Sequence, residues 1–169
     1  MKKIFFVLTI VSAALFASCR KDTQSPNSKL SPVNDLFVAA NFQGINWVAQ
    51  PITSFNAAND TLTVKGFYQA NNQYLVFKVR FAGPGVYSLT GSDQASFYTV
   101  DQSNATTSFY KLDTSKTTNT VTITSFNPAI DIAEGDFQLS FMKTSGAASA
   151  PNTADFANGK LWIQVPIKQ

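Results

Sequence analysis

The side chains that most often carry enzyme chemistry are scarce in this sequence. Its 169 residues include no histidine and a single cysteine, Cys19. Imidazole is the usual base of Ser–His–Asp and Cys–His nucleophile systems, so both systems are excluded. Zinc sites built from His and Cys are excluded too, because Cys19 is assigned to another role below. The sequence therefore predicts no catalytic residue, no metal site and no cofactor.

Paired carboxylates are the remaining candidates for catalysis, and they gather in one short segment. Asp131, Glu134 and Asp136 lie close together in the sequence, and the last two share one face of a predicted strand. Two acids separated by ~5–9 Å would suit a glycoside hydrolase. Exposed carboxylates at the start of a strand are the more common situation. We therefore expect a solvated strand entry and no enzyme, with a carboxylate-based hydrolase as the less favoured alternative.

Outward aromatic side chains are the stronger indication of a binding site. Trp162 alternates with aliphatic residues of the last strand, so it falls on the opposite face; Tyr74 and Phe67 do the same on their own strands. Such rings stack on the apolar faces of sugars. Alternatively, they pack against neighbouring strands or cover a small second core. These three residues are the candidate ligand-binding residues, whereas Trp47 is assigned to the core.

The N-terminus has the organisation of a secretory signal. Lys2 and Lys3 precede an apolar run of fourteen residues, 4–17. At 1.5 Å per residue this run spans about 21 Å, short of the ~30 Å that a membrane-spanning helix needs. A signal peptide over residues 1–18 is therefore predicted rather than a transmembrane anchor.

The segment Phe16-Ala17-Ser18-Cys19 resembles the lipobox of bacterial lipoproteins. In a lipobox the cysteine thiol is alkylated by a diacylglyceryl group and becomes the new N-terminus. Two or three acyl chains, palmitate among them, give stable anchoring, because each buried methylene contributes ~0.8 kcal/mol. Arg20 is not the aspartate of an inner-membrane retention signal, so the outer membrane is expected, with the periplasmic side and the cell surface both open.

Composition predicts a β-rich domain with no nucleic-acid role. Without Lys2 and Lys3 the mature chain has 11 basic residues (13 minus 2) against 10 acidic ones, and it has no basic block that could follow a phosphate backbone. Only 14% of residues are charged, and 15 are phenylalanine, a residue that favours strands. The polar, proline-bearing segment 19–33 is expected to be a flexible tether, followed by a single domain over 34–169.

Alternating hydrophobicity predicts about nine to ten short strands and no helix beyond the signal. The clearest alternation places Leu75, Phe77, Val79 and Phe81 inward. Strand spacing favours an antiparallel β-sandwich or a flattened up-and-down barrel, and most connections are short enough for hairpins. Residues 144–155 are expected to form the longest loop, and Asn158-Gly159 to introduce the last strand.

Several segments, in this order, resemble an uncharacterised family of small Bacteroidota lipoproteins. They are Phe42-Gln-Gly-Ile-Asn-Trp47, Phe81-Ala-Gly-Pro-Gly-Val-Tyr-Ser-Leu89, Val121-Thr-Ile-Thr, Phe137-Gln-Leu-Ser-Phe141 and Asn158-Gly159-Lys-Leu-Trp-Ile. The family pattern at the first segment is Asn-Gly-x-x-Trp, and Gln43 replaces its Asn. The resemblance implies a β-rich outer-membrane or surface lipoprotein and carries over no functional residue. Asp60-Thr61-Leu62 also resembles the O-glycosylation pattern of this phylum.

These observations lead to an expected function. We expect a lipid-anchored, non-catalytic module of the cell envelope that contacts a glycan or an envelope protein through its aromatic sheet face or the 144–155 loop. A carrier of a small apolar ligand inside a barrel is the first alternative, and the carboxylate hydrolase is the second.

Overall fold

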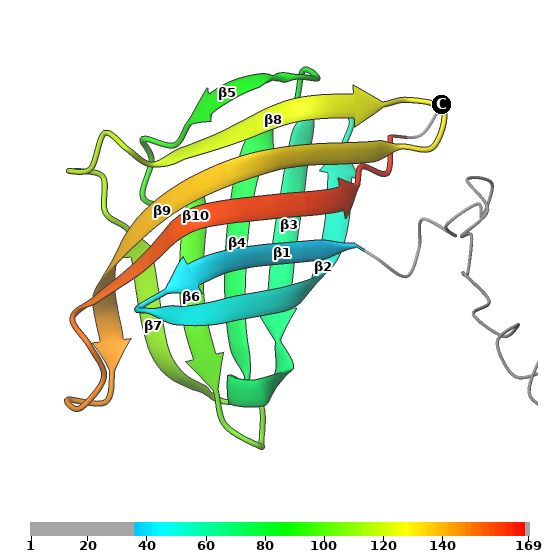
Figure 1. The fold of residues 1–169 in the computed structure, drawn as a ribbon. Coiled ribbons are helices and arrows are strands. Elements are labelled where there is room, and N and C mark those ends of the chain that lie inside the picture. The colour runs from blue at the N-terminus through cyan, green and yellow to red at the C-terminus, as the bar shows by residue number, and fades with distance from the viewer. Residues whose placement is uncertain (1–35, 168–169) are drawn as a thin grey trace, which may run out of the picture. The chain divides into compact units, whose positions relative to one another are not determined.

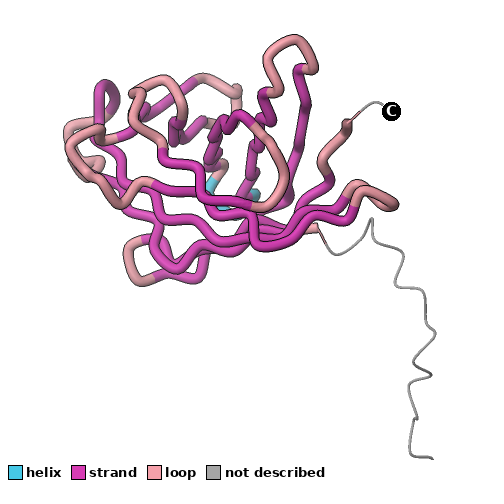
Figure 2. The backbone as a smooth tube through the Cα atoms, turned by 90° about the horizontal axis from the view of Figure 1, so that it is seen from above, coloured by secondary structure: helices cyan, strands magenta, loops and turns pink. Residues whose placement is uncertain are grey.

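The computed structural model describes residues 36–167, and it confirms the all-β prediction. Ten antiparallel strands and one turn of 3-10 helix account for most of this range (Figure 2). The elements are β1 (Phe37–Phe42), β2 (Ile45–Asn56), β3 (Thr61–Tyr68), η1 (Gln69–Asn71), β4 (Gln73–Arg80), β5 (Gly85–Ser88), β6 (Ala95–Val100), β7 (Thr106–Leu112), β8 (Thr120–Asn127), β9 (Ile132–Gly146) and β10 (Thr153–Gln164).

The sheet closes on itself, as in the predicted flattened barrel. The order of neighbours is β10-β1-β2-β3-β4-β6-β7-β9, and β9 pairs with β10 to complete the ring. The two remaining strands, β8 and β5, extend one side of it: β8 pairs with residues 132–138 of β9, and β5 pairs with β8. The predicted, mostly up-and-down order therefore holds from β1 to β4, whereas β5 leaves its sequence neighbours to pair with β8, and β7 pairs with β9 instead of β8.

Two layers of strands enclose the core. In Figure 1, β8, β9, β10 and β1 form the front layer, and β3, β4, β6 and β7 run steeply across them behind. The long strands β2 and β9 join the layers, because each pairs with different neighbours along its length. β2 pairs with β1 through Ala49 and with β3 from Gln50 onward, whereas β9 pairs with β8 first and with β7 from Phe141 onward.

Aromatic side chains fill the space between the layers. Phe156 lies at the centre of the rings, with its centroid 4.7 Å from that of Phe42 and 5.2 Å from those of Trp47 and Phe97. The ring of Phe141 follows at 5.9 Å. Trp47 is fully buried, as predicted, and its indole nitrogen donates a hydrogen bond to Gln73 Oε1 at 3.0 Å. The middle of the closed sheet is therefore occupied by side chains.

A buried asparagine ties the loop before β8 to its surroundings. Asn119 is 1% exposed, and its amide nitrogen donates to the Asp113 carbonyl at 2.7 Å. Its amide oxygen accepts from the Ser140 backbone N–H at 2.8 Å, and its own carbonyl accepts from Leu89 N–H at 2.9 Å. These bonds satisfy backbone groups from three segments at once.

The C-terminal third departs from two sequence predictions. The predicted loop over 144–155 is only 147–152, because β9 extends to Gly146 and β10 already begins at Thr153. Asn158-Gly159 does not introduce the last strand. It forms a β-bulge inside β10, where pairing with β9 skips from Phe156 to Gly159 and Asn158 adopts a φ of 52°. Asn-Gly favours positive φ in a bulge as well as in a turn, so the dipeptide alone does not separate the two.

Three predictions fall on residues outside the described range. The signal peptide over 1–18, the lipidation of Cys19 and the tether over 19–33 all precede Leu36. Within residues 36–167, no helix is long and apolar enough to cross a membrane.

Candidate functional site

Phe67 and Tyr74 lie on the outer surface, as the alternation predicted, and the strand register places them side by side. They are direct partners across β3 and β4, and their ring centroids are 4.7 Å apart at an interplanar angle of 21°. Tyr98 on β6 stacks on Tyr74 at 4.9 Å, and Phe109 on β7 continues the row at 6.1 Å from Tyr98. We call these four half-buried rings the aromatic ladder.

Within the aromatic ladder, neighbouring rings cover the ring faces on which a sugar would stack. Neighbouring strands lie about 4.8 Å apart, so parallel cross-strand rings cover one another face to face. Tyr74 has Phe67 on one face and Tyr98 on the other. It therefore presents mainly a ring edge and its hydroxyl outward, and the interpretation that these rings pack on neighbouring strands fits Tyr74 better than ligand stacking does.

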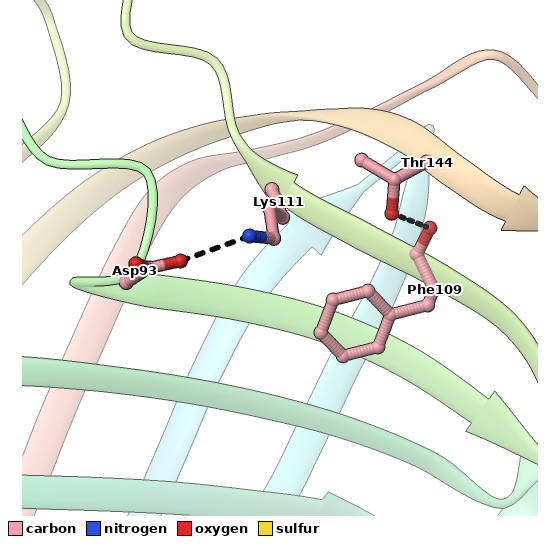
Figure 3. Close-up of polar contacts among 4 residues, drawn as sticks. All are labelled: Asp93, Phe109, Lys111 and Thr144. Atoms are coloured by element: carbon pink, nitrogen blue, oxygen red, sulfur yellow. Dashed lines mark hydrogen bonds and ion pairs between the residues drawn. The ribbon is translucent and has the colours of Figure 1, made fainter.

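Basic residues flank the ladder. The Lys65 amino group lies 4.3 Å from the centroid of Tyr74, in cation–π range. At the far end, Figure 3 shows Lys111 and Phe109 on β7, with Lys111 Nζ 3.0 Å from Asp93 Oδ1. Thr144 Oγ donates to the Phe109 carbonyl at 3.2 Å, which ties β9 to the end of the ladder. These contacts give the ladder a structural role.

Trp162 is different, because no ring among the described residues 36–167 stacks parallel to it. It lies on β10 as the cross-strand partner of Phe37 and Glu134. Phe37 approaches edge-to-face, with centroids 6.5 Å apart at 72°. The side chain is half-buried, yet its indole nitrogen is inaccessible and has no hydrogen-bond partner within residues 36–167. Solvent therefore reaches the Trp162 side chain only at carbon atoms, which is the surface on which a sugar ring stacks.

A groove runs along the outer faces of β8, β9 and β10 from Trp162. One part, of about 240 Å³, is lined by Phe37, Thr124, Glu134, Gly135, Asp136, Lys160, Leu161 and Trp162. The adjoining part, of about 310 Å³, shares Asp136 and Lys160 and adds Thr120, Thr122, Phe137, Gln138, Asn158 and Gly159. A carbon platform thus lies at one end of a row of hydroxyl, amide and charged groups.

Two glycines let the three strands approach closely beneath this groove. A Cβ on Gly135 of β9 would lie 2.1 Å from the Thr122 carbonyl oxygen of β8. A Cβ on Gly159 of β10 would lie 2.5 Å from the Phe137 ring and backbone oxygen of β9. Both distances are far below van der Waals contact, so a larger residue would push the strands apart and change the groove floor.

The carboxylates considered for catalysis do not form one cluster. Glu134 and Asp136 share the outer face of β9, as predicted, but Asp136 forms an ion pair with Lys160 across β10. Asp131 lies in the turn before β9, with a φ of 55°. Within the described range, no group of three acidic or thiol side chains is close enough to hold a metal ion.

The lowered carboxyl pKa values belong to loops outside the groove. In the β6–β7 loop the Ser103 hydroxyl, followed by the Ala105 N–H, lowers the pKa of Asp101. In the β7–β8 loop the hydroxyl and the N–H of Ser115 lower the pKa of Asp113. Each carboxylate accepts a hydrogen bond from a backbone N–H of its own loop, Asp101 from Ala105 and Asp113 from Ser115. These two carboxylates therefore stabilise loop conformations.

Sequence reasoning missed several residues of this surface. Phe37 borders the Trp162 groove and also a hollow of about 250 Å³ that contains Gln50 and Phe67, so it connects Trp162 to the ladder. Phe37 and Tyr98 alternate with buried residues on their strands, and this signal was available in the sequence. The pairing of Lys160 with Asp136 could not be found from the sequence, because it depends on the register between β9 and β10.

The closed sheet and the outer groove lie within one conserved type of domain. A family model described as a domain of unknown function, DUF6252, matches residues 34–166. The chain belongs to the DUF6252 family. The DUF6252 match contains every strand and every groove residue, and it agrees with the expected uncharacterised family. No curated protein and no solved structure matches this chain.

Proposed function

We propose that this DUF6252 protein is a lipid-anchored, non-catalytic module of the cell envelope that binds a glycan in the Trp162 groove. The observation that carries the proposal is the carbon surface of Trp162 at the end of a polar groove. Carbohydrate sites combine an aromatic platform for the C–H faces of a sugar with side chains that bond its hydroxyls. Thr122, Gln138 and Asn158 supply such groups along the groove.

A binding role fits the groove better than hydrolysis does. Asp136 is held by Lys160, so of the two acids on β9 only Glu134 has no ion-pair partner within residues 36–167. A glycosidase of the usual kind needs two carboxyl groups that flank the scissile bond, one of them as a proton donor.

The anchor is part of the proposal. Cys19 follows a signal-like run and a lipobox-like segment, and the tether over 19–33 precedes the domain. Diacylglyceryl and palmitoyl chains on Cys19 would hold the domain at the outer membrane of a Bacteroidota cell, on the periplasmic or the outer side. The tether would allow the groove to meet a polymer beside the membrane.

The carrier alternative has less support. An apolar ligand inside the closed sheet would need the space that Phe42, Phe97, Phe141 and Phe156 occupy. Displacing packed aromatic rings is costly, because each buries 150–250 Å² of surface.

A protein partner is the second candidate, and a separate surface favours it. On the outer face of β2, Val48 and Ile52 are 49% and 61% exposed, with Gln50 between them. Exposed aliphatic side chains are typical of contact surfaces when they lie together. Crosslinking at Val48 in membranes, with the exposed Thr106 of β7 as a control position, would show whether an envelope protein covers this strand.

Calorimetry with a panel of polysaccharides tests the glycan proposal. The full chain, purified in detergent, is titrated beside a Trp162→Ala variant and a Tyr74→Ala variant. We expect one polysaccharide class to bind, with the heat lost in Trp162→Ala and retained in Tyr74→Ala. Absence of binding across the panel, or equal heats for the wild type and Trp162→Ala, would reject glycan binding at this groove.

A further inference from the structure

Glu134 is a free negative charge beside the aromatic platform. It is exposed on β9 and is the direct cross-strand partner of Trp162. The two ion pairs within residues 36–167 join Lys111 to Asp93 and Lys160 to Asp136, so neither neutralises Glu134.

The other charges that line this part of the groove cancel. Asp136 and Lys160 form an ion pair, and the remaining lining residues, Phe37, Thr124, Gly135, Leu161 and Trp162, are uncharged. The corner formed by Trp162, Phe37 and Glu134 therefore carries one net negative charge next to two aromatic rings. A carboxylate beside an aromatic face is complementary to an ammonium group, which bonds the carboxylate and is attracted by the ring.

We propose that this corner binds the protonated amine of an amino sugar, so that the groove prefers glycans with free amino groups. The inference rests on the proposed glycan-binding function and names the class of glycan. The ring carbons of the sugar would lie on Trp162, its ammonium group would face Glu134, and neighbouring sugars would follow the row of polar side chains toward Gln138 and Asn158. Asp136 contributes little charge, because Lys160 already neutralises it.

The test compares two sets of oligosaccharides of equal length that differ only at the amine, which is a charged ammonium in one set and a neutral acetamide in the other. The full chain in detergent is titrated at mildly acidic pH with short glucosamine oligomers and with the fully N-acetylated oligomers of the same length. An exposed cation–π contact and an exposed ion pair together predict about tenfold tighter binding of the amine form. Glu134→Gln should abolish this preference, by lowering the affinity for the amine form to that of the acetylated form.

The control variant is Asp155→Asn, which removes one exposed carboxylate from β10, the strand that carries Trp162, outside the groove lining. It should retain the tenfold preference. Equal affinity for both oligomers, or the same loss in Asp155→Asn as in Glu134→Gln, would overturn the inference. If acetylated or other neutral glycans bind through Trp162 without an amine preference, the inference fails and the glycan-binding function stands. If no glycan binds, both fail, and Glu134-dependent binding of a lysine-rich peptide would point to a protein partner instead.

Discussion

Replacing Tyr74 with alanine tests whether the aromatic ladder is structural. Tyr74 makes two stacked contacts, at 4.7 and 4.9 Å, and one cation–π contact with Lys65 at 4.3 Å. Aromatic pairs contribute about 0.5–1.5 kcal/mol each beyond area burial, and an exposed cation–π contact about 0.5–1 kcal/mol. The variant should therefore lose about 2–3 kcal/mol of unfolding free energy. With an unfolding entropy of about 2.1 cal/mol/K per residue, this lowers the Tm by about 7–10 °C.

Urea unfolding followed by tryptophan fluorescence measures this loss. Tyr74→Phe keeps both stacked contacts, so it should stay within about 0.5 kcal/mol of the wild type. A double-mutant cycle with Tyr98→Ala should give a coupling of about 0.5–1.5 kcal/mol. The reasoning is refuted if Tyr74→Ala leaves the urea midpoint unchanged, or if it abolishes glycan binding while the fold keeps its stability. Trp162→Ala should show the reverse pattern, with a small loss of stability and a large loss of affinity.

Four further predictions address the anchor and the fold. Cys19→Ser should abolish palmitate incorporation and move the protein from the membrane fraction to the soluble fraction; labelling of the wild type is the control. Asn119→Ala should cost about 2–4 kcal/mol in urea unfolding, because a buried N–H and a buried carbonyl lose their partners. Gly135→Ala should cost about 3 kcal/mol or more, because its Cβ would meet a β8 carbonyl oxygen. The pKa values of Asp101 and Asp113 are lowered in the fold, so their stabilisation is present above the ordinary value of 3.8 and is lost as pH falls below it. The double variant Asp101→Asn/Asp113→Asn should therefore lose less unfolding free energy than the wild type as the pH falls below 3.8. Equal losses of unfolding free energy in the two proteins would contradict this.

The inward and outward faces of most strands were predictable from sequence, because alternation is a local property. The predicted inward set is buried: Leu75, Phe77 and Val79 on β4, and Phe81 directly after it. Trp162 lies on the outer face. Hydrophobic alternation does not specify the register between neighbouring strands. The stacking of Tyr74 on Tyr98 and the pairing of Asp136 with Lys160 depend on which residues face each other across strands far apart in the chain.

In two segments, strand pairing overrides a local sequence preference. β2 continues through Pro51 to Asn56, although proline rarely lies within a strand. Proline is tolerated there because β1 begins at Phe37, so β2 has no described partner on that side beyond Gln50. The bulge at Asn158 extends β10 past a dipeptide that usually marks a turn. In both places tertiary pairing overrides a local preference.

Acrylamide quenching of tryptophan fluorescence tests the Trp162 groove most directly. The chain has two tryptophans, and Trp47 is 0% exposed, so acrylamide reaches Trp162 and leaves Trp47 unaffected. The account predicts that saturation with the polysaccharide identified by calorimetry sharply lowers the quenching constant of the unmodified chain. An unchanged quenching constant, while calorimetry shows the polysaccharide bound, would contradict the account and place the glycan elsewhere on the protein.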